Sequence, residues 1–361
     1  MNLRLFAFIL ISLFWKLIIS GQPFTEKNTY SKSIPVNRDV ILELDNRYGA
    51  INITPWNKDV VSVKAEIEAF APNQERLRNM INGIDVAITE AELLVRVRTE
   101  FSQGITKLIE NFKEITSKVI PYESGIQINY FITAPEYLDM KIINKYGDVL
   151  MENSTGKLSL ELSNGSFKAN SVSEAEIIEL VFCDVTINNV TKGVINTSFS
   201  DVEINESQNL TLTSVSSKFY LKQAAIINID SRRDKFTIGT VSSVSGISYF
   251  TDYYIGELLK DINLDTKYGD LNIDLIDENF ELVSIKSTYM DITLTLHKAT
   301  SYNLDIKHLN AFLILPEKSS DISKKTINED KKEFMTYGTV GNNPGNRKVL
   351  IDANRGNIHI K

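Results

Sequence analysis

The sequence NKYGDVLM at residues 144–151 recurs in closely similar form elsewhere in the chain. NRYGAINI occupies residues 46–53, TKYGDLNI residues 266–273 and STYMDITL residues 287–294, and NRGNIHIK ends the chain. Recurrence of one short sequence motif indicates a repeat architecture in which each copy is one structural unit.

Further copies lie between these at a nearly constant spacing. Counting from Asp148 in steps of 17 or 18 residues gives the series Ser166, Asp184, Asp201, Lys218, Lys235, Asp252 and Asp270, and Asp291 follows after 21. The first and third residues after each of these positions are apolar, and the second is mostly polar, as in Val202, Glu203 and Ile204. This alternation is typical of a strand with one buried face.

A weaker second strand follows the first within each unit, for example in NLTLTS from Asn209. One such unit cannot bury its own apolar face, so successive units must stack, with equivalent residues ~4.8 Å apart. The sequence therefore predicts an all-β fold, a single-stack β-solenoid with 17–18 residues per coil.

Two columns of residues mark one corner of the predicted coil. The position before the aspartate column is small in most copies, as in Gly147, Gly165 and Cys183, which suits positive φ or a close backbone approach. Cys183 is accordingly expected to be a buried packing residue. One position earlier, aromatic residues recur and should stack along the axis, either as a structural ladder or as a sugar-binding strip: Tyr48, Tyr146, Phe182, Phe199, Phe250, Tyr268 and Tyr289.

The whole chain divides into three predicted regions. Residues 1–21 have the charged start, apolar run and small residues of a signal peptide. Residues 22–140 are predicted as a β-rich N-terminal cap with two short amphipathic helices, near 74–83 and 104–119. Residues 141–361 form the solenoid, and the charged stretch within about 317–347 is predicted as a solvated loop.

Composition limits the cellular compartments and the classes of partner that are possible for this protein. The net charge of −7 argues against a nucleic-acid partner, because phosphate binding needs a basic face. Cys183 is the only cysteine, so no internal disulfide is possible. Beyond the signal the sequence offers no integral membrane span. We expect an exported protein of the bacterial periplasm or cell surface, held together by its own core.

The chain resembles the bacterial "putative adhesin" family of exported β-solenoids, whose function is largely unknown. The resemblance rests on the N-[RK]-Y-G-x-[IV] copies at 46–51 and 144–149, and on the segments ITPWNKDVVSVKAEI and GKLSLELSNGSFKA that follow them. It covers essentially the whole mature chain. It implies a solenoid fold and an interaction role, and it transfers no catalytic residues.

Few residues in the sequence are candidates for catalysis, metal binding or ligand binding. The aspartate column could bind Ca²⁺ or could accept hydrogen bonds from backbone N–H groups at its corner. His297, His308 and His359 fall in no metal motif. We predict no catalytic, cofactor-binding or metal-binding residues. Tyr220 and Tyr254 occupy outward positions of their strands and are the candidate surface-binding residues.

Three functions remain open on this basis. The first is a non-catalytic, adhesin-like solenoid that presents an extended surface to a glycan or an envelope protein. The second is an envelope scaffold or a regulatory module that binds another protein. The third is a carbohydrate-active enzyme, since two carboxylates of a glycosidase-like pair could come from distant coils.

Overall fold

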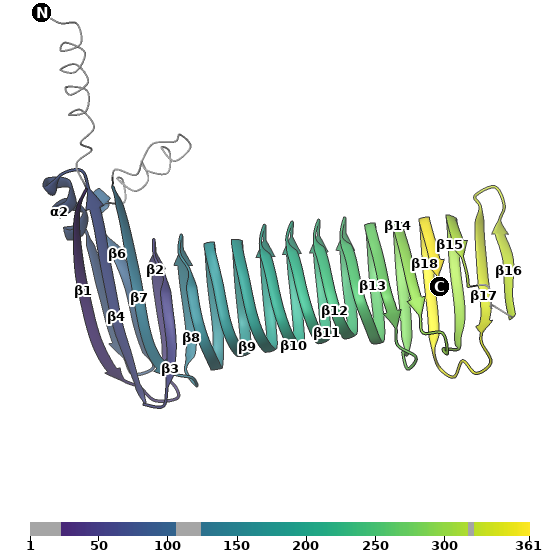
Figure 1. Cartoon of the computed structure of the whole chain (residues 1–361), viewed down its shortest axis with the longest axis horizontal. Coiled ribbons are helices and arrows are strands. Elements are labelled where there is room, and N and C mark those ends of the chain that lie inside the picture. Colours follow the sequence, from purple (N-terminus) through teal and green to yellow (C-terminus); the bar gives the residue numbers. More distant parts are fainter. Residues whose placement is uncertain (1–22, 106–123, 317–320) are drawn as a thin grey trace, which may run out of the picture.

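The computed structural model describes residues 23–105, 124–316 and 321–361. The chain forms one elongated stack of strands that runs from β1 at one end to β16 at the other (Figure 1). The all-β prediction is therefore confirmed. The predicted signal at 1–21 and nearly all of the predicted helix at 104–119 lie outside the described residues.

The central part of the stack consists of parallel coils. Its elements are β9 (Val149–Ser198), β10 (Asp201–Val215), β11 (Lys218–Arg232), β12 (Lys235–Tyr249), β13 (Asp252–Ile276) and β14 (Leu282–Leu296). Asp184 pairs with Asp201, Asp201 with Lys218, and Lys218 with Lys235. This register is the 17-residue step predicted from the sequence, so the solenoid prediction is confirmed.

The alternating apolar residues face inward, as predicted. Val202, Ile204, Leu210 and Leu212 of β10 are fully buried. Inside the stack, Phe236 lies between Phe219 and Tyr253, with ring centroids 4.7 and 5.3 Å apart. The apolar side chains of each coil thus pack against those of the coils on either side, and this burial provides the hydrophobic stabilisation of the solenoid.

The N-terminal strands continue the same stack. They are β1 (Phe24–Pro35), β2 (Ile41–Arg47), β3 (Ile51–Trp56), β4 (Val60–Ala71), β5 (Ile84–Ala91), β6 (Leu94–Phe101), β7 (Gly125–Pro135) and β8 (Asp139–Lys145). β2 pairs with β8 and β3 with β9, so the first copy of the repeated motif stacks directly on the second. On the side opposite to β8 and β9, β2 pairs with β6 and β3 with β7. β4 then pairs with β7, and β1 pairs with β4, both antiparallel.

The helix predicted near 74–83 is confirmed as α2 (Gln74–Asn82). The Asn73 side chain accepts a hydrogen bond from the Arg76 N–H and caps its N-terminus. Leu77, Met80 and Ile81 are buried, which places the predicted apolar face against the stack.

The C-terminal end departs from sequence order. Its strands are β15 (Tyr302–Ile314), β16 (Asp321–Asn328), β17 (Glu333–Val340) and β18 (Lys348–Ile360), and β18 lies between β14 and β15. The prediction of a loop within 317–347 is wrong over β16 and β17, which form an antiparallel hairpin on β15. Most side chains of this hairpin are at least partly exposed, so it lacks the alternation that marks the other strands.

The corner of the coil agrees with the prediction only in part. Gly269 of the small-residue column has a positive φ of 127°, but positive φ falls mainly on the aromatic column, for example 56° at Phe182 and 57° at Phe250. The small residue that follows is needed at several coils for another reason. A Cβ on Gly147 would clash with the carbonyl oxygen of Gly49, because adjacent coils approach closely there.

Candidate functional site

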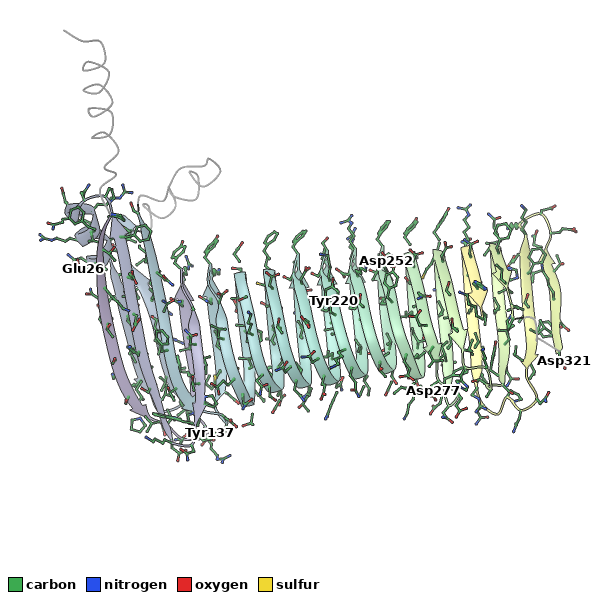
Figure 2. The ribbon with its side chains drawn as sticks, viewed as in Figure 1. Glu26, Tyr137, Tyr220, Asp252, Asp277 and Asp321 are labelled. Atoms are coloured by element: carbon green, nitrogen blue, oxygen red, sulfur yellow. The ribbon has the colours of Figure 1, made fainter. Side chains whose placement is uncertain are left out.

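The aromatic column forms a ladder of stacked rings along one edge of the solenoid. The centroids of Phe182 and Phe199 are 5.0 Å apart, and those of Phe250 and Tyr268 are 4.6 Å apart, with interplanar angles of 11° and 6°. Tyr289 stacks on Tyr268 at 5.3 Å. Figure 2 shows side chains projecting in a row from the edge of the stack on which the labelled Asp252 lies. The predicted ladder is confirmed.

The rings of the ladder face solvent. Tyr48 is half-buried, and the exposed fractions of the other rings run from 40% at Tyr268 to 57% at Phe182. A bulky residue in the left-handed region costs roughly 1–2 kcal/mol, and a stacked aromatic pair returns ~0.5–1.5 kcal/mol. The turn itself does not require a ring, because Asn164 and Ser216 adopt the same conformation at φ 56° and 54°. Exposed rings held in strained backbone are typical of a functional surface.

The ladder is interrupted over two coils, at Ser216 and Arg233. Phe199 is stacked on one side by Phe182, so its second face is directed toward Ser216. Phe250 is stacked by Tyr268, so its second face is directed toward Arg233, which is exposed. Three coil spacings of ~4.8 Å separate Phe199 from Phe250, so about 14 Å of this edge, the gap in the ladder, carries Ser216 and Arg233 in place of rings.

The two tyrosines predicted as candidate surface residues lie on the face beside this gap. Tyr220 and Tyr254 are 44% and 39% exposed and point outward, as the alternation requires. The structure does not bring them together, because Thr237 lies between them in the register. Tyr220 belongs to the coil of Ser216 and Tyr254 to the coil of Phe250. The ammonium of Lys235 lies 5.0 Å from the Tyr254 ring centroid.

The aspartate column makes hydrogen bonds to the backbone of the next coil. Asp148 accepts from the Ser166 N–H at 2.8 Å, and Asp291 accepts from the Asn357 N–H at 2.8 Å. Lys218 forms an ion pair with Asp201 at 3.3 Å. These contacts agree with the backbone-capping interpretation of the column. Within the described part of the chain, no three His, Cys, Asp or Glu side chains are grouped so that they could hold a metal ion.

A buried carboxylate lies directly beneath the gap in the ladder. Asp234 is 4% exposed and follows Arg233 at the small-residue position. Its Oδ1 accepts from the Ser217 N–H at 2.6 Å, and its Oδ2 accepts from the hydroxyls of Ser214 and Ser231 at 2.6 and 2.7 Å. This network fixes the corner from inside. Sequence reasoning missed it, although an aspartate in a column of Gly, Ser and Cys was a visible signal.

Cys183 occupies the same small-residue column and is buried, as predicted. Its thiol contacts the carbonyl oxygens of Leu162 and Val181, each at 3.3 Å. Burial is the main cause that raises the pKa of this thiol. Cys183 therefore acts as a small core residue of the corner.

A cleft of about 680 Å³ lies at the turn near Tyr137, at the lower edge of the stack (Figure 2). Trp56 and Tyr137 line it, but cations already cover ring faces. The Arg38 guanidinium lies 4.8 Å from the Tyr137 ring centroid, and the Lys58 ammonium lies 5.0 Å from the Trp56 ring. The Tyr137 hydroxyl donates to Asp59 at 2.7 Å. The ladder, with open faces at its gap, is the stronger candidate.

Comparison with known proteins adds a likeness of fold. No protein-family model matches the chain, and no curated protein matches it in sequence. Among solved structures it is similar to a "putative adhesin" from Bacteroides fragilis, with 14% identity and a TM-score of 0.33 over 73% of this chain and 98% of that one. A "putative cell adhesion protein" from Clostridium sporogenes gives 11% identity and a TM-score of 0.20 over 94% and 100%.

A "putative adhesin" from Parabacteroides merdae gives 9% identity and a TM-score of 0.29 over 73% of this chain and 95% of that one. These descriptions name the same class of protein as the one that the repeated sequence motif indicates by resemblance. At such identities and TM-scores the likeness carries no information on ligand or partner. No helix in the described parts of the chain is long and apolar enough to cross a membrane.

Proposed function

We propose that this protein is an exported, non-catalytic, adhesin-like solenoid that binds a glycan along the edge that carries the aromatic ladder. The observation that carries the proposal is the two-coil gap between the exposed faces of Phe199 and Phe250. A pyranose ring has a face of C–H groups that packs against an aromatic face and withdraws apolar surface from water.

Polar groups beside the gap suit the hydroxyls of a sugar. Ser216 and Arg233 line the ladder where rings are missing, and Tyr220 and Tyr254 lie on the adjoining face. Phenylalanine rings bind by packing and supply no acid, base or nucleophile, so we assign the edge a binding role. Export to the periplasm or cell surface is proposed from the predicted signal at 1–21.

Binding to a glycan array tests the proposal. We expect the double variant Phe199→Ala/Phe250→Ala to lose binding by at least ~30-fold, since truncating two central aromatic contacts removes 2 kcal/mol or more. The double variant Tyr220→Ala/Tyr254→Ala reports whether the adjoining face belongs to the site. Tyr337→Ala removes an equally exposed ring from β17 and is the matched control. Equal glycan binding by the wild type and the Phe199/Phe250 variant would contradict the proposed site.

The protein-binding alternative has its own readout. If no glycan is retained but one envelope protein co-purifies and is lost in the Phe199/Phe250 variant, the edge is a protein interface and the glycan proposal is wrong. Thermal unfolding of each variant shows whether it keeps the fold, because truncation of Phe199 or Phe250 also removes a stacked pair.

A further inference from the structure

Among the described residues, part of one strand edge in the last coil of the solenoid has no strand partner. β15 pairs along Asn303–Ile314 with β18 on one side, but on its other side β17 pairs only with Tyr302–Leu309. In the described strand pairings, residues 311–314 therefore have a partner on one side only. Unpaired N–H and C=O groups of a strand edge are a template for another strand.

This edge lacks the protection that the other strand edges carry. The sequence at 311–314 is AFLI, and Phe312 and Ile314 are 77% and 55% exposed. The outer strand β16 carries Lys324 and Lys325, and β1 at the opposite end carries Glu26, Lys27 and Lys32. Charged side chains on an edge strand oppose unwanted pairing. The edge at 311–314 has no charged side chain, in contrast to these two strands.

An apolar groove adjoins the unpaired edge. Its volume is about 510 Å³, and it lies between residues 310–315 and the β16–β17 hairpin. Its lining includes Leu313, Ile322 and Phe334, with Lys324 and Lys332 also lining it. The Lys324 ammonium lies 4.0 Å from the Phe334 ring centroid. The groove thus combines an apolar floor with two cations.

We propose that an extended peptide segment of a partner protein, with apolar and acidic residues on one face of its strand, adds to this edge as a further strand. Main-chain hydrogen bonds to residues 311–314 provide affinity, and apolar side chains enter the groove. Because alternate side chains of a strand point to the same face, charge complementarity with Lys324 and Lys332 selects acidic residues among those that face the groove. The site is separate from the aromatic edge and does not depend on glycan binding.

Fluorescence polarisation with a labelled glutamate–valine heptapeptide tests this proposal on the full-length protein. Glutamate and valine take turns on one face of its strand, and threonine occupies the intervening positions. We expect saturable binding, at least tenfold weaker binding by the Lys324→Glu/Lys332→Glu variant, and unchanged binding by Lys325→Glu. Lys325 lies on the same strand but does not line the groove, so it is the matched control. A lysine–valine heptapeptide should not bind.

A second peptide separates strand addition from nonspecific apolar contact. Methylation of alternate backbone nitrogens keeps the side chains but removes main-chain donors, so it should abolish binding. Equal binding of the methylated peptide, or no saturable binding of the glutamate–valine peptide, overturns the proposal. Sedimentation showing a dimer that Phe312→Lys dissociates would also overturn it, because the edge would then be an interface between two copies.

Discussion

Gly147 is required because adjacent coils approach each other closely at their corner. A Cβ at this position would meet the backbone of Gly49, which cannot move aside as a flexible side chain can. We expect Gly147→Ala to lower the free energy of unfolding by about 2–3 kcal/mol, the usual cost of overpacking. Chemical denaturation measures it. Gly193→Ala is the control, because its Cβ would meet only side chains; an equal loss there would contradict the explanation.

Asp234 is a second residue on which the corner depends. Besides Ser214, Ser217 and Ser231, the Arg232 N–H donates to its Oδ2 at 3.0 Å. Asp234→Ala leaves these buried donors without their acceptor, so we expect a loss of about 3 kcal/mol or more in unfolding free energy. The exposed Asp230→Ala should change it by less than ~0.5 kcal/mol. Matching denaturation midpoints for both variants would show that the network contributes little.

Asp270 of the aspartate column makes the stability of its coil depend on pH. Burial is the main cause that raises the pKa of Asp270, and the charges of Asp252 and Asp291 raise it further. The folded state then binds this proton more tightly than the unfolded state does. Stability from this group is greatest at low pH and falls as pH rises through the interval between the unfolded and folded pKa values.

Asp270→Asn should therefore be more stable than the wild type at neutral pH, by no more than about 1 kcal/mol, the usual limit for exposed charge pairs. The difference should vanish near about pH 3, where the carboxyl is protonated in both states. Thermal melts across this pH range measure it, with Asp261→Asn as a carboxylate outside the column. A stability gain that persists at low pH would show that ionisation of the Asp270 carboxyl is not its cause.

At the scale of elements, alternation was predictable wherever one face is buried. Val202 and Ile204 could be placed inside because their neighbours are polar, and α2 because Leu77, Met80 and Ile81 share one helical face. β16 and β17 were missed, since exposed strands carry no such pattern and are defined by pairing with β15. The position of β18 depends on a long-range choice of neighbour that local sequence does not encode.

The candidate site was likewise predictable from the sequence in part only. The aromatic column was predictable because its members recur at the coil period, and the outward direction of Tyr220 and Tyr254 follows from alternation. The left-handed backbone at the rings was not predictable, because Phe and Tyr disfavour it and only the stacked corner holds them there. The gap at Ser216 and Arg233 became a site only once the rings on either side were known to stack.

At the scale of the whole molecule, both ends close the stack by placing a coil out of chain order. The coil of β2 and β3 lies between that of β6 and β7 and that of β8 and β9. β18 likewise lies between β14 and β15. Each end is thereby tied to segments distant in sequence, whereas the middle follows chain order (Figure 1). Coils of the middle should then be interchangeable units whose stabilities add through neighbouring contacts.

Deleting one whole coil tests this interchangeability. Removal of residues 201–217 joins Ser200 to Lys218 and restores the register, because Lys218 then takes the place of Asp201 beside Asp184. The Ser200 N–H would meet the Asp234 carboxylate as the Ser217 N–H does now. We expect a folded protein whose maximum dimension in small-angle scattering is shorter by about 5 Å, one interstrand spacing.

Removal of only residues 201–209 is the control for that deletion. It joins the corner directly to the second strand of the coil, so the apolar face of one strand no longer continues the face below it. We expect this shorter deletion to lose the cooperative thermal transition that the whole-coil deletion keeps. If both deletions unfold the protein alike, the middle coils are not equivalent, and the stack depends on specific contacts of the coil at 201–217.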